Sequence, residues 1–158
     1  MKSKADRLLL IFLLFLIMGL IWFHLFDREV QILCALDLSP FMRYTVLHIE
    51  DTHSGFHGDG KSFYKLHFSN CSIETQIQKS DKWQYGTLPD VVKQGIHKAD
   101  VLIQEMEKVY WFYDDQHNSA VYDKRMDTNK LSSGLSNNYV IAVYVPEYCL
   151  LYYVAFDT

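Results

Sequence analysis

The feature that most constrains this chain is a nearly unbroken apolar run near its amino terminus, at residues 8–26. Only Gly19 and His24 interrupt its leucine, isoleucine, phenylalanine, methionine and tryptophan residues. Nineteen helical residues at about 1.5 Å each extend roughly 28 Å, which matches the hydrocarbon thickness of a bilayer. The run therefore predicts a transmembrane helix, with a buried core helix as the less favoured alternative.

The flanks of this run predict its orientation. Lys2, Lys4 and Arg7 precede it, and Arg28 follows it. Because basic flanks stay on the cytoplasmic side, we expect the amino terminus in the cytoplasm and the rest of the chain outside it. Bulky and charged residues after the run argue for an uncleaved signal anchor in the cell membrane. The expected organisation is a cytoplasmic basic flank at 1–7, a signal anchor at 8–26, a stem or first strand at 27–42 and an extracytoplasmic α+β domain at 43–158.

Length, charge and cysteine content bound the outer portion. A chain of 158 residues has room for one membrane segment and one small domain. The net charge is −4 for the whole chain and −6 once the basic amino terminus is set aside, which makes nucleic acid an unlikely partner class. The three cysteines lack the spacing of a metal site. Because there are only three, one internal bridge at most can form, and Cys71 with Cys149 is one possible pair.

Hydrophobic periodicity predicts an antiparallel sheet with one or two short helices. Residues 44–50 and 63–68 alternate between apolar and polar side chains, as the strands of a hairpin do. Two β-branched and aromatic runs around Pro146 predict a second hairpin. The expected elements further along the outer domain are helices at 72–80 and 89–97, the second weakened by Gly95, a possible central strand at 109–113, a long loop at 114–138 and hairpin strands at 139–145 and 149–156.

The segment at residues 51–60, Asp-Thr-His-Ser-Gly-Phe-His-Gly-Asp-Gly, is where we expect a functional site. It places two histidines and two aspartates among three glycines at the expected tip of the first hairpin. Residues 55–62 also match the phosphate-loop pattern, but that motif requires a following helix, and here an alternating strand is expected. We therefore do not expect nucleotide binding.

Two chemical interpretations of this loop stay open. His53, His57 and Asp59 could bind a divalent metal, because imidazole and carboxylate groups are suitable ligands for one. A hydrolase could instead use a histidine as general base, oriented by Asp51 or Asp59, with a nearby hydroxyl or water as the nucleophile. Local capping of the turn by Asp51 and Thr52 explains the same residues without any chemistry.

The chain resembles an uncharacterised family of small, single-spanning proteins of Gram-positive bacteria. Members carry Asp-Thr-His-Gly-Gly-Phe-His-Gly-Asp-Gly and end near Tyr-Tyr-x-x-Phe-Asp-Thr. The matching segments here are residues 51–60, with Ser54 in place of a glycine, and residues 152–158. The resemblance implies a membrane-anchored or exported domain, and it supplies no activity, cofactor or catalytic residue. The residues that it marks as a signature loop are Asp51, Thr52, His53, Phe56, His57 and Asp59.

These observations together predict a membrane-anchored extracytoplasmic domain that binds an unidentified ligand or protein of the cell envelope. The signature loop is the expected recognition site, because loops on rigid scaffolds commonly carry recognition. A metal-dependent or His/Asp hydrolase that uses residues 51–60 is the alternative. The sequence favours binding over catalysis, since no spacing in the loop is diagnostic of an enzyme.

Overall fold

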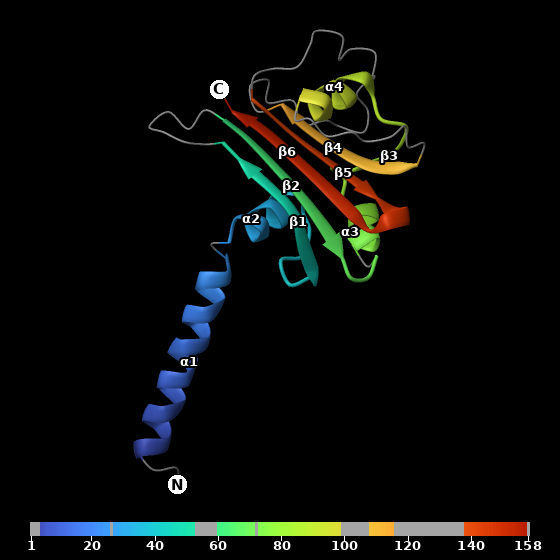
Figure 1. The fold of residues 1–158 in the computed structure, drawn as a ribbon. Coiled ribbons are helices and arrows are strands. Elements are labelled where there is room, and N and C mark those ends of the chain that lie inside the picture. Colours follow the sequence, from blue (N-terminus) through green and yellow to red (C-terminus); the bar gives the residue numbers. More distant parts are fainter. Residues whose placement is uncertain are drawn as a thin grey trace.

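The computed structural model describes residues 4–25, 27–52, 60–71, 73–98, 108–115 and 138–157. Over these ranges the protein is α+β, with one six-stranded antiparallel sheet and four α-helices (Figure 1). The fold class predicted from the sequence is therefore confirmed. The elements are α1 Lys4–Leu25, α2 Arg28–Ala35, β1 Tyr44–Asp51, β2 Gly60–Phe68, α3 Ile73–Lys79, β3 Gln84–Gly86, α4 Asp90–Lys98, β4 Val109–Asp115, β5 Tyr139–Val145, a 3-10 helix Pro146–Tyr148 and β6 Leu150–Asp157.

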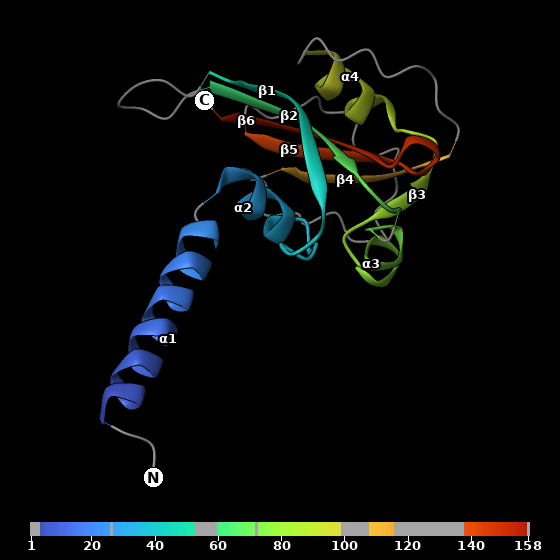
Figure 2. The same cartoon turned by 60° about the horizontal axis from the view of Figure 1, so that its bottom comes forward.

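Helix α1 extends away from the sheet domain (Figures 1 and 2). Its large apolar side chains from Leu9 to Trp22 are exposed, each by more than two fifths of its surface. Among the described residues, no helix was identified as long and apolar enough to cross a bilayer.

Residues 27–42 were expected to form a stem or a first strand, and helix α2 corrects the second of these alternatives. The apolar residues Val30, Leu33 and Leu36 recur every three residues, which is a helical spacing, and all three are buried. The density of apolar residues in this segment suggested a strand because the spacing was not weighed. The helix places its apolar stripe on the sheet, and each fully buried leucine contributes about 1.5–3 kcal/mol.

The carboxyl end of α2 is closed by a Schellman motif. Asp37 adopts the left-handed conformation with φ of 58°, where glycine is the commoner residue. The Leu38 amide then donates to the Leu33 carbonyl at 2.8 Å, and both side chains are buried together. The Trp83 indole donates to the Leu36 carbonyl at 3.0 Å. These bonds satisfy carbonyls that a helix end leaves without partners, and they tie α2 to the chain after α3.

The strand order of the sheet is β1-β2-β6-β5-β4-β3, and every neighbouring pair is antiparallel. The chain forms the β1–β2 hairpin, passes through α3 to the opposite edge, and returns strand by strand until β6 pairs with β2. Both predicted hairpins and the predicted helices at 72–80 and 89–97 are confirmed. The three-residue strand β3 was not predicted, because so short a segment shows no periodicity. Strand β4 extends to Asp115, into the predicted loop, and residues 116–137 lie outside the described residues.

Helices cover both faces of the sheet. Figure 2 shows α2 and α3 against one face and α4 against the other. Alternate strand residues enter two separate hydrophobic clusters, as the two-residue period of a strand requires. Leu66 and Tyr144 belong to the cluster under α2 and α3, whereas Phe63 and Val143 belong to the cluster under α4.

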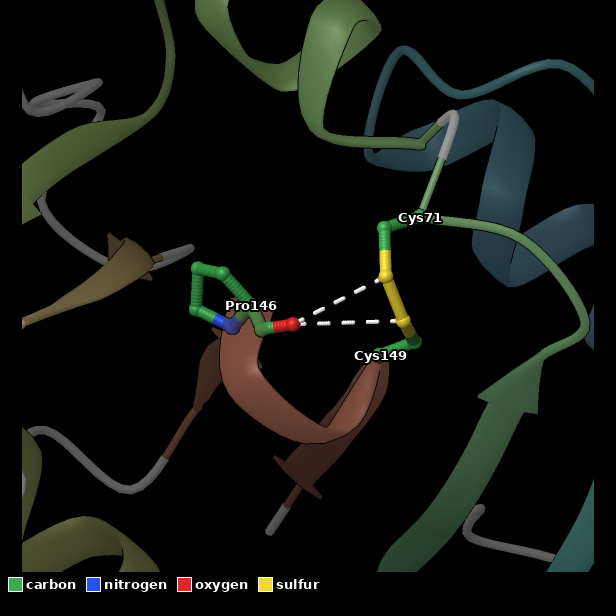
Figure 3. Close-up of a disulfide and its surroundings, with 3 residues drawn as sticks. All are labelled: Cys71, Pro146 and Cys149. Carbon is green, nitrogen blue, oxygen red and sulfur yellow. Dashed lines mark hydrogen bonds between the residues drawn. A yellow bond between two sulfur atoms is a disulfide. The ribbon is translucent and has the colours of Figure 1, made fainter.

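A disulfide joins Cys71, just before α3, to Cys149 at the start of β6 (Figure 3). The Pro146 carbonyl oxygen lies 3.7 and 3.9 Å from the two sulfur atoms. The structure thus settles the pairing that the sequence left open, and Cys34 is a free, exposed thiol. Because the bridge joins residues 78 positions apart, it lowers the entropy of the unfolded chain and stabilises the fold by about 4.5 kcal/mol in the chain-entropy account.

Gly95 lets α4 approach the sheet closely. A methyl group at this position would overlap the Cδ1 atom of Ile141 and lie 3.2 Å from the Tyr139 ring. The Gly95 carbonyl also accepts a hydrogen bond from the Tyr139 hydroxyl at 3.4 Å. The residue that weakens the predicted helix is therefore the one that permits its packing.

We predict that Gly95→Ala destabilises the full chain by about 1–2 kcal/mol, since overpacking costs more than the roughly 1 kcal/mol gained in helix propensity. Ile141→Val removes the overlapping methyl group, so the double variant should recover at least about 0.5 kcal/mol relative to additivity. Urea unfolding of the four proteins in detergent measures this coupling. Additive effects, or a stabilised Gly95→Ala variant, would contradict the close approach.

Candidate functional site

The predicted site lies at the end of the sheet where β1 stops at Asp51 and β2 begins at Gly60. Asp51 and Thr52 are exposed at this end. The remaining predicted site residues, His53, Phe56, His57 and Asp59, lie outside the described residues. The described part of the predicted site consists of the two strand ends, at Thr52 and at Gly60.

Reciprocal hydrogen bonds close the base of the segment. The Thr52 amide donates to the Lys61 carbonyl at 2.9 Å, and the Lys61 amide donates to Thr52 Oγ1, also at 2.9 Å. The Thr52 hydroxyl lies 3.3 Å from the same Lys61 carbonyl and donates to it. Thr52 thus continues the ladder by one residue beyond β1, which fixes the two ends of the segment relative to each other.

An ion pair supports the same base on one face of the sheet. Lys61 Nζ lies 2.9 Å from a Glu50 carboxylate oxygen, with the two side chains 20% and 40% exposed. Partly exposed pairs of this kind contribute at most about 1 kcal/mol. The pair therefore orients Lys61 more than it stabilises the domain.

The carboxyl-terminal strand lies directly beside this base. In the β2–β6 register, Gly60 pairs with Asp157 and Lys61 pairs with Phe156. Figures 1 and 2 both place the end of β6 next to the ends of β1 and β2. The described ends of the two segments that carry the family resemblance, Asp51, Thr52 and Gly60 from one and Asp157 from the other, therefore lie at the same end of the sheet, here called the loop end. The sequence analysis missed this proximity, because pairing between distant strands leaves no local signal.

A tyrosine pair lies behind the loop end, on the face covered by α2. Arg28 donates a hydrogen bond to the Tyr64 hydroxyl, and Tyr64 meets the Tyr153 ring edge-on at 6.2 Å. Burial raises the pKa of Tyr64, as does the Asp51 carboxylate, whereas Arg28 lowers it. Burial likewise raises the pKa of Tyr153. Both hydroxyls are therefore neutral at physiological pH and act as hydrogen-bonding groups.

The described residues give limited support to catalytic chemistry. Thr52, a candidate nucleophile, already uses its hydroxyl to accept from and donate to Lys61. Ser62, another hydroxyl near the loop, is 1% exposed within β2. Within the described ranges, no group of three or more histidine, cysteine, aspartate or glutamate residues is placed to bind a metal ion. The predicted metal ligands His53, His57 and Asp59 lie outside those ranges.

The structural context of the phosphate-loop match is also clear. A strand, β2, begins at Gly60 and includes both Lys61 and Ser62. The expectation of a strand at this position is confirmed. Phosphate loops depend on the amides of a following helix, and that arrangement does not occur at these residues.

Comparisons with protein families, with curated proteins and with solved structures give no match to this chain. The resemblance to the Gram-positive family thus stays a prediction.

Proposed function

We propose that the protein is a membrane-anchored extracytoplasmic binding domain that presents its loop end to a ligand or protein of the cell envelope. The observation that carries the proposal is the β2–β6 register, which sets Asp157 beside Gly60. This pairing gathers exposed polar residues from two distant parts of the chain onto one rigid end of a sheet. Binding sites commonly occupy such positions, because the scaffold holds the recognition groups in place.

Helix α1 supports the anchoring part of the proposal. The apolar run at residues 8–26 has the length of a bilayer span, and basic residues precede it. The helix also exposes apolar side chains along the length described. Exposed apolar surface of this extent is rare in soluble monomers and marks contact with a membrane or a partner.

The chemistry of the loop end supports binding over hydrolysis. The described hydroxyl groups near the loop are either hydrogen-bonded or buried, as Thr52 and Ser62 are. Asp51 and Asp157 are exposed, and each presents a carboxylate to a partner. Cationic or hydrogen-bond-donating groups on the partner suit this surface.

Labelling of the free thiol of Cys34 tests on which side of the membrane the domain lies. In intact cells that express the full chain, a membrane-impermeant maleimide should label Cys34, because it is exposed and follows the proposed span. Labelling is measured by the mass shift of the protein in the membrane fraction. Cys34→Ser should abolish it, and Ser3→Cys in that background should be labelled only after permeabilisation. Labelling of Cys34 only after permeabilisation, or a protein found in the soluble fraction, would contradict the proposed topology.

Site-specific photocrosslinking tests recognition by the loop end. A benzophenone amino acid placed at Thr52, and separately at Asp157, should give the same adduct, because the two positions lie at one end of the sheet. The adducts are identified by mass spectrometry after purification from the membrane. Tyr148 is the control, since it is similarly exposed and lies at the opposite end of β6. An adduct shared with Tyr148, or none from either test position, argues against recognition at the loop end.

A further inference from the structure

Side chains from α3, from the segment after it and from the edge strand β3 line a groove. Figure 2 shows α3 and β3, and β3 is at the other edge of the sheet from β1. The groove has a volume of about 510 Å³. The residues that line this groove, here called the α3–β3 groove, are Ile77, Gln78, Ser80, Trp83, Gln84, Tyr85 and Tyr110. None of them belongs to the loop end.

An aromatic platform forms one side of the groove. Tyr85 is 60% exposed, although its ring centroid lies only 4.7 Å from that of Tyr110. The two residues are direct partners across the β3–β4 pairing, so their side chains point to the same face. The Tyr85 ring thus packs against its neighbour with the two ring planes at 45°, while the residue stays accessible.

Hydrogen bonds fix Tyr110 and Trp83, the two other aromatic residues of the groove. Gln78 Nε2 donates to the Tyr110 hydroxyl at 2.8 Å, and that hydroxyl donates to a Glu74 carboxylate oxygen at 3.0 Å. The indole of Trp83 is fixed by its bond to the Leu36 carbonyl. The groove is therefore formed in advance, which lowers the entropy cost of binding.

The polar groups of the groove are neutral. Gln84 and Ser80 offer an amide and a hydroxyl group, and no lining side chain in the described part of the chain is charged. The Gln84 side chain lines the groove and makes no hydrogen bond to any described residue, so its amide oxygen and nitrogen are not engaged within the described part of the chain. This chemistry disfavours phosphate groups and ionised ligands, which require opposite charge.

A second groove continues from the first at Ser80. It has a volume of about 540 Å³, and Ser80 lines both grooves. Its walls include the ion pair between Lys82 and Asp37, at 2.9 Å, and the amide of Gln76. The two grooves thus adjoin at Ser80, with hydrogen-bonding groups on both sides of it.

We propose that the α3–β3 groove binds a neutral oligosaccharide, with Tyr85 as the stacking surface. A sugar ring presents an apolar face of C–H groups that packs on an aromatic ring, and its hydroxyl groups both donate and accept hydrogen bonds, as amides do. An exposed, fixed tyrosine beside uncharged amides matches both properties. A peptide strand added to β3 would gain little, because β3 has only three residues.

Binding of two neutral tetrasaccharides to the full chain in nanodiscs tests this proposal. The probes are the tetramer of N-acetylglucosamine and maltotetraose, measured by saturation-transfer NMR and calorimetry. At least one should bind, and Tyr85→Ala should lower its affinity about tenfold, since the stacked ring is lost. Tyr85→Phe should keep the affinity, because it keeps the ring, and Gln84→Ala should lower it several-fold.

The matched control is Tyr148→Ala, which removes a similarly exposed tyrosine that does not line the groove and should leave affinity unchanged. Circular dichroism and the urea midpoint establish that each variant is folded. The proposal is overturned if neither tetrasaccharide binds at millimolar concentration. It is also overturned if a folded Tyr85→Ala variant binds as tightly as the unchanged protein.

Discussion

The pairing of β2 with β6 is the interaction on which the rest of this domain depends. It runs over eight residue pairs and joins the β1–β2 hairpin to β6, and through β6 to the other strands of the sheet. A two-stranded hairpin alone is marginally stable in water, so β1 and β2 need this contact to persist. The same pairing sets Leu66 opposite Leu151 and Phe63 opposite Val154, and thereby extends the hydrophobic clusters on both faces.

The loop end, the disulfide and the α3–β3 groove lie at different ends and edges of this sheet. The loop end lies at one end of β2 and β6, and the Cys71–Cys149 disulfide fastens the other end. The α3–β3 groove lies at the edge farthest from β1 in the strand order. Helices on both faces cover apolar side chains of the central strands, whereas Leu47 and Ile49 of the edge strand β1 are exposed. Helix α1 extends from the side of the domain where α2 lies (Figure 1).

Local patterns in the sequence predicted much of this fold, and interactions between distant residues account for what was missed. Alternation predicted β1 and β2, and the β-branched runs predicted β5 and β6. Residues 27–42 were expected to be a stem or first strand, and the strand alternative was wrong because composition was weighed above the helical spacing of α2. The sequence also located the segment at 51–60, but the approach of Asp157 to Gly60 depends on a register that no local pattern encodes. Tyr85 gave no signal, because its exposure arises from its place on an edge strand.

Native-state hydrogen exchange tests most directly whether β2 and β6 unite the domain. In the full chain, amides in the middle of β2 and β6 should open together with those of β5, at the free energy of global unfolding. The amides would be followed by NMR or mass spectrometry under increasing urea. If β2 instead exchanges at a clearly lower free energy than β5 and β6, the amino-terminal hairpin unfolds by itself, and the β2–β6 pairing does not hold the loop end together.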